Sequence, residues 1–97
     1  MSRSELPTPQ QIASAAASVE LLRTWVLPSG DLVCSVNASA WKDPAYWGML
    51  LADVARHAAK AMQGAHGLPA DESLRQMAHL FCVELSHPTD SLPGEFS

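Results

Sequence analysis

Residues 43–62 read DPAYWGMLLADVARHAAKAM, and this stretch decides the fold class of the 97-residue chain. It begins with Asp43 and Pro44, a pair typical of an N-cap followed by the first helical residue. Apolar residues then recur at intervals of three and four, as on one face of a helix: Trp47, Leu50, Leu51, Val54, Ala55, Ala58, Ala61 and Met62. The sequence therefore predicts an amphipathic helix that begins at Pro44, buries this stripe and ends by Gly64. Gly48 in its first turn predicts close approach of Trp41 or Trp25.

A turn signal precedes this helix. Residues 28–31, Pro-Ser-Gly-Asp, separate two runs with β-strand composition, residues 22–27 and 32–36. The sequence therefore predicts a β-hairpin, although residues 19–22 are compatible with either helix or strand. Alternation places Leu22, Thr24 and Val26 on one face of the first strand and Arg23, Trp25 and Leu27 on the other.

Two further helices complete the expected domain. Residues 9–18 predict a short, alanine-rich helix, and residues 71–87 predict a long helix that Pro88 ends. The fold class is therefore α+β, with an antiparallel hairpin packed against two long helices and a short N-terminal helix. We expect a single domain over residues 9–90, a disordered or extended tail over residues 1–8 and a C-terminal tail over residues 91–97. Because two strands leave two open edges, we also expect dimerisation to extend the sheet.

Composition narrows the class of protein. Hydrophobic residues make up 47% of the chain and charged residues 16%, with a net charge of -4, as in a globular protein with much apolar surface. The six Lys and Arg residues are scattered, so we expect no nucleic-acid partner. No apolar run suggests a signal peptide or a membrane span, so we expect a cytoplasmic protein without a membrane partner. Cys34 and Cys82 follow no metal-binding spacing, and we expect both to be reduced and buried.

The candidate site residues are Trp25, Trp41, Trp47, Asp53, Arg56 and His57. Asp53 and His57 stand four residues apart and can touch on one helix face, where a carboxylate can orient a histidine as a base. An ordinary ion pair on a solvated or interface-rim face, with Arg56 beside it, is the interpretation that we favour. The tryptophans are either pocket walls or core and interface anchors. We expect no catalytic residue, no metal site and no cofactor.

The segment from residue 41 to residue 57 also carries a resemblance. Its W-x-D-P-x-x-W-G core, Trp41 to Gly48, followed by D-x-x-R-H, Asp53 to His57, resembles a family of small bacterial proteins whose domain has no assigned function. The resemblance covers residues 19–90 and implies a compact, independent domain. It implies no catalytic role for any residue.

These observations favour a protein that is not an enzyme and acts by association, with itself and with a larger protein partner. The low charge, the open hairpin edges and the tryptophans support this hypothesis. The alternative is a module that binds a small ligand or a metal ion at the polar edge of the second helix.

Overall fold

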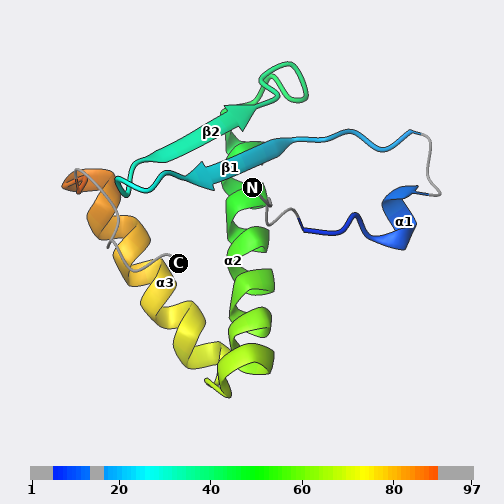
Figure 1. Cartoon of the computed structure of the whole chain (residues 1–97). Coiled ribbons are helices and arrows are strands. Elements are labelled where there is room, and N and C mark those ends of the chain that lie inside the picture. The colour runs from blue at the N-terminus through cyan, green and yellow to red at the C-terminus, as the bar shows by residue number, and fades with distance from the viewer. Residues whose placement is uncertain (1–5, 14–16, 90–97) are drawn as a thin grey trace.

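The computed structural model describes residues 6–13 and 17–89, and its elements follow the order α1, β1, β2, α2, α3 (Figure 1). Helix α1 spans Gln10–Ala13, strands β1 and β2 span Leu22–Val26 and Leu32–Val36, and helices α2 and α3 span Pro44–His66 and Ala70–Ser86. The α+β class and the antiparallel hairpin are confirmed. The expected tails at residues 1–5 and 91–97 lie outside the described residues.

Local signals in the sequence account for the ends of the long helices. The side chain of Asp43 accepts a hydrogen bond from the Ala45 N–H at 3.0 Å, which confirms it as the N-cap of α2. Gly67 ends the same helix in the left-handed conformation, with φ at 71°, and its N–H donates to the Gln63 carbonyl. Helix α2 thus continues past Gly64, and the prediction that it ends there was wrong. His87, which precedes Pro88, is not helical, so α3 ends at Ser86 and not at the predicted residue 87.

The N-terminal region is less helical than predicted. Helix α1 covers four residues, whereas we expected residues 9–18. Residues 14–16 lie outside the described part of the chain, and Ala17 and Ser18 are not helical. Residues 19–21 are neither helix nor strand, and β1 begins at Leu22. The ambiguity at residues 19–22 is therefore resolved against a helix.

The hairpin is closed by a three-residue loop with a bulge. The Gly30 N–H donates to the Leu27 carbonyl at 2.8 Å, and the Leu27 N–H donates to the Asp31 carbonyl at 2.8 Å. Gly30 has φ at 93°, which is the left-handed position that such a loop requires. The strands pair antiparallel, with Thr24 opposite Cys34 and Trp25 opposite Val33.

Helices α2 and α3 approach each other at the Gly67 turn and diverge toward the hairpin, which lies across their open ends (Figure 1). The partly covered residues nearest the turn follow helical spacing on both helices: Ala55, Ala58, Ala59 and Met62 on α2, and Ala70, Ser73, Leu74 and Met77 on α3. Among the described elements, Cα atoms come within 8 Å of each other only between β1 and β2 and between α2 and α3.

Little of the predicted core is buried within one chain. Ala59, which is 2% exposed, is the one hydrophobic side chain among the described residues that is buried. The predicted stripe of α2 includes Leu51 and Val54, which are 41% and 46% exposed, because α3 has already diverged at their level. The thiols of Cys34 and Cys82 are free but exposed, so the prediction that they are buried was wrong. Nothing lies within 4 Å of a Cβ placed on Gly48, so the close approach expected there is absent in the described chain.

The two glycines at the end of α2 give a matched test of this helix end. We predict that Gly64→Ala raises the free energy of unfolding by about 0.5–1 kcal/mol, because Gly64 is helical with open space around it. Gly67→Ala should lower it by about 1–2 kcal/mol, because alanine is strained at a positive φ. Chemical denaturation at one protein concentration measures both changes. Equal effects of the two substitutions would contradict the assignment of Gly67 as the helix C-cap.

Candidate functional site

Three aromatic rings gather at the start of α2. Trp41 lies just before the Asp43 cap, and Tyr46 and Trp47 lie in the first turn of the helix. The ring centroids of Trp41 and Trp47 are 5.3 Å apart in a T-shaped arrangement, and those of Trp41 and Tyr46 are 6.1 Å apart. Such edge-to-face contacts are favourable beyond the area that they bury. The capping of α2 at Asp43 therefore also places the aromatic cluster.

An open cavity of about 320 Å³ adjoins this cluster. Its lining residues are Trp41, Tyr46, Met49, Leu50 and Asp53. The four residues from α2 lie within two helical turns at spacings of three and four, so they share one helix face. Asp53 is the charged residue of the lining, and the remaining walls are apolar or aromatic. The cavity has the size of a small ligand site, and its chemistry suits an apolar or positively charged group.

Asp53, Arg56 and His57 form an exposed ion cluster beside the cavity. Arg56 Nη1 lies 3.6 Å from Asp53 Oδ1, and His57 Nδ1 lies 3.6 Å from Asp53 Oδ2. His57 Nδ1 is also 2.8 Å from the Asp53 backbone carbonyl, and a hydrogen bond there requires the proton on Nδ1. The His57 side chain is 77% exposed and projects into solvent, so no cleft formed by the described residues encloses the Asp53–His57 pair. Ion pairs this exposed contribute little to stability.

The structure thus brings together some of the candidate residues and separates others. Trp41 and Trp47 are in contact, and Asp53 lies further along the same helix, against the cavity. Trp25 belongs to β1, is 46% exposed and is not among the residues that line the cavity. Tyr46, Met49 and Leu50 were not among the candidate residues. Their spacing from Asp53 could have identified them, but it also fits the core stripe to which Leu50 was assigned.

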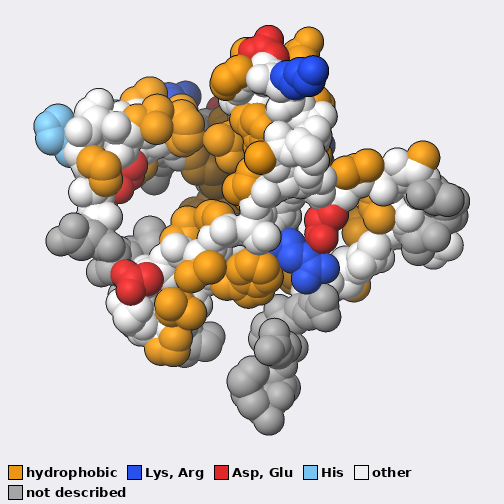
Figure 2. All heavy atoms as spheres, turned by 90° about the horizontal axis from the view of Figure 1, so that it is seen from above, with side chains coloured by type: hydrophobic (Ala, Val, Ile, Leu, Met, Phe, Trp, Pro, Cys, Tyr) orange, Lys and Arg blue, Asp and Glu red, His pale blue; other side chains and the backbone are white. Residues whose placement is uncertain are grey.

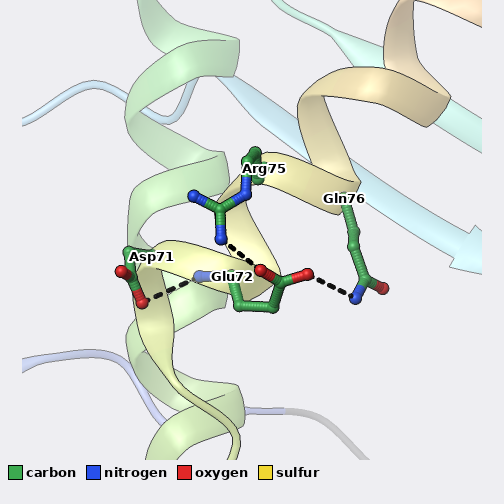
Figure 3. Close-up of polar contacts among 4 residues, drawn as sticks. All are labelled: Asp71, Glu72, Arg75 and Gln76. Carbon is green, nitrogen blue, oxygen red and sulfur yellow. Dashed lines mark hydrogen bonds and ion pairs between the residues drawn. The ribbon is translucent and has the colours of Figure 1, made fainter.

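A second polar cluster lies at the start of α3 (Figure 3). The Glu72 carboxylate accepts hydrogen bonds from Arg75 and from Gln76, and the Asp71 side chain accepts one from the Glu72 N–H at 2.9 Å. The hydrogen bond and charge of Arg75, with the Gln76 hydrogen bond, lower the pKa of Glu72, and Glu72 raises the pKa of Arg75. Acidic residues in a first helical turn also favour the helix dipole. All of these groups are solvent-exposed, and this cluster supports the helix start.

Glu84, near the end of α3, holds the segment that follows the helix. Its carboxylate accepts hydrogen bonds from the hydroxyl and the backbone N–H of Thr89, and both lower the pKa of Glu84. Within residues 6–13 and 17–89, no group of three or more His, Cys, Asp or Glu side chains is placed to hold a metal ion. In the same residues, no helix is long and apolar enough to cross a membrane.

Comparisons with known proteins identify the family. The model of the domain of unknown function DUF5076 matches residues 5–89, and the chain belongs to this family. No curated protein matches the chain. A solved structure described as that of "a putative pyruvate dehydrogenase from the photosynthetic bacterium Rhodopseudomonas palustrus CGA009" is similar, with 34% identity and a TM-score of 0.68. The match covers 99% of this chain and 97% of that chain, so the likeness extends over the whole of both.

The Glu72–Arg75 pair makes a prediction about pH. Because the folded-state pKa of Glu72 is lowered, its contribution to stability is present above the unfolded value of about 4.3 and is lost as pH falls through the folded pKa. We predict that Arg75→Gln raises the pKa of Glu72, as measured by NMR titration of its side-chain carboxyl carbon. The stability difference between wild type and variant should be present at neutral pH and vanish in acid.

Arg56→Gln is the matched control, because Arg56 also pairs with a carboxylate three residues away but lies on α2. It should leave the titration of Glu72 unchanged. An unchanged pKa of Glu72 in Arg75→Gln would show that the pair does not persist in solution.

Proposed function

We propose that this member of the DUF5076 family functions as a homo-oligomer, at least a dimer, and acts through protein–protein association. The observation that carries the proposal is the exposure of large hydrophobic side chains in the single chain. They lie on the hairpin and on the diverging halves of both long helices: Trp25, Leu27, Leu32, Val33, Val36, Tyr46, Met49, Leu51, Val54, Leu80, Phe81, Val83 and Leu85. Contiguous apolar surface of this kind marks interaction sites.

The lack of a buried core supports the same proposal. Among the described residues, Ala59 is the one hydrophobic side chain that is buried. A self-sufficient domain of this length buries a larger apolar core.

A second copy could cover these exposed hydrophobic side chains. Permanent homodimers bury about 2,000–5,000 Å² over the two chains, with interfaces as apolar as a protein core. Figure 2 shows hydrophobic side chains over much of the face seen from above, with single acidic and basic side chains between them. Such a face suits apolar association and offers no basic patch for nucleic acid.

The description of the similar solved structure as a pyruvate dehydrogenase does not fit the cavity of this chain. Pyruvate is an anion, and the charged group against the cavity is the carboxylate of Asp53. Like charges at close range disfavour binding. We therefore do not propose this activity here.

Binding of a small ligand is the second candidate function, and the cavity beside Trp41 is the observation that favours it. Aromatic walls from Trp41 and Tyr46 and the carboxylate of Asp53 suit a small organic cation. The described residues give metal binding no comparable support. This second function places the ligand at the edge of the polar face of α2.

Self-association would raise the mass of the protein in solution. We predict that the full chain has at least twice the mass of one chain by light scattering at micromolar concentration. Phe81→Arg, which places a charge on the open half of α3, should weaken the assembly at least tenfold, because buried aromatic anchors contribute more than about 1.4 kcal/mol to such interfaces. Phe81 is 50% exposed in the single chain, so arginine fits without disturbing its fold.

Leu68→Arg is the matched control, because Leu68 is 43% exposed and lies at the opposite, closed end of the helix pair. It should leave the mass unchanged. A monomeric wild-type chain would overturn the proposal, and equal effects of the two variants would remove the open end of the helices from the interface.

The second candidate function predicts saturable binding of tetramethylammonium, measured by tryptophan emission and thermal unfolding. Asp53→Asn should weaken this binding, whereas Arg56→Gln, outside the cavity lining, should not. The absence of saturation and of any shift in unfolding temperature would exclude an organic-cation site. Thermal unfolding with and without a chelator tests separately whether the protein binds a metal ion.

A further inference from the structure

The outer edge of β2 presents unpaired backbone groups. The hydrogen bonds from Leu27 to Asp31 and from Asn37 to Leu21 show which facing pairs of the ladder exchange hydrogen bonds. These pairs alternate along an antiparallel ladder, so Trp25 with Val33 and residue 23 with residue 35 belong to the same bonded set. The N–H and carbonyl groups of Leu32, Cys34 and Val36 consequently point away from β1. Among the described residues, the Val36 carbonyl accepts from the Ala38 N–H, and no backbone bond outside the hairpin reaches Leu32 or Cys34.

This edge lacks the usual protection of an edge strand. Natural edge strands are blocked by charged residues, prolines or covering segments. The sequence of β2, LVCSV, contains neither a charge nor a proline, and all five residues are exposed. In contrast, β1 carries Arg23 and has both of its end residues, Leu22 and Val26, partly covered. In Figure 1, no element lies beyond β2 on the side away from β1.

We propose that β2 pairs antiparallel with β2 of a second copy, with the twofold axis at Cys34, to form a continuous four-stranded sheet. This inference rests on the proposed self-association and names the surface that it uses. The occupant is a second copy because the hairpin and both long helices expose large hydrophobic side chains, and because an antiparallel pair of identical strands satisfies both edges at once.

The register follows from the outward-pointing groups. Centring the pair on Cys34 places Leu32 opposite Val36 of the second copy and Cys34 opposite Cys34 of the second copy. The outward backbone groups of Leu32, Cys34 and Val36 then all find a partner. A shift by two residues in either direction loses part of this set, and a shift by one reverses the faces of the side chains. The centred register also aligns the apolar face of Leu32, Cys34 and Val36 with its copy.

The two Cys34 residues on the axis make the inference testable. Facing residues in a bonded pair have Cα atoms about 5.5 Å apart, within reach of a short thiol crosslinker. The Cys34 thiol is free and exposed in the single chain, with Thr24 Oγ1 3.4 Å away across the hairpin. The experiment treats the full chain carrying Cys82→Ser with a short bis-maleimide and measures covalent dimer on a denaturing gel. We expect a covalent dimer in high yield.

The matched control moves the thiol from β2 to β1, on the same face of the hairpin. A chain with Cys34→Ser, Cys82→Ser and Thr24→Cys carries its thiol on β1, directly opposite position 34. It should give little covalent dimer, which also controls for chance collisions. Cys34→Lys should weaken the dimer at least tenfold, because two like charges would meet on the axis, whereas Thr24→Lys should have a smaller effect.

The outcomes separate this inference from the proposed self-association. Suppose that light scattering shows a dimer, and that this dimer crosslinks through Cys34 and not through a thiol at position 24. This result supports both the β2 seam and the proposed self-association. A dimer that does not crosslink through Cys34, or crosslinks through position 24 instead, overturns the β2 seam and leaves self-association in place. A chain that is monomeric by light scattering overturns both.

Discussion

The short contact between α2 and α3 is the constraint on which the rest of the structure depends. The helices meet near the Gly67 turn through a stripe in which alanines predominate on α2, and Ala59 is the buried side chain at its centre. Small side chains allow close approach but bury little area. Because the helices diverge beyond this contact, their open halves have no partner within the described chain. The hairpin leaves large side chains of these halves uncovered, since Val54 is 46% exposed and Phe81 is 50% exposed.

The aromatic cluster and the exposed hydrophobic side chains are two consequences of this arrangement. Trp41 and Trp47 pack against each other at the start of α2, where no other described element covers them closely. The cavity beside them is open for the same reason. In an oligomer, a second copy that approaches this end of the molecule would cover the cavity. The two proposed functions would therefore use the same region of the molecule.

Predictions from the sequence were accurate where a few neighbouring residues determine the outcome. The cap at Asp43, the hairpin turn with Gly30 and the end of α3 just before Pro88 each depend on local backbone chemistry. The end of α2 was misplaced because Gly64 and Gly67 are both plausible stops, and the difference lies in a positive φ that composition does not reveal. The burial of Leu51 and Val54 was wrong because periodicity shows which face of a helix is apolar and not whether another element covers it.

The candidate site was likewise predictable in part. The sequence alone determined that Asp53, Arg56 and His57 would lie together, because helical spacing brings residues three and four apart into contact. It also determined the α+β class and the alternating faces of the hairpin. Only the tertiary structure decided that His57 faces solvent while Asp53 lines a cavity, that Trp25 stands apart from Trp41, and that both cysteines are exposed. These outcomes depend on how elements distant in the sequence are placed in space, which the spacing of residues within one element does not specify.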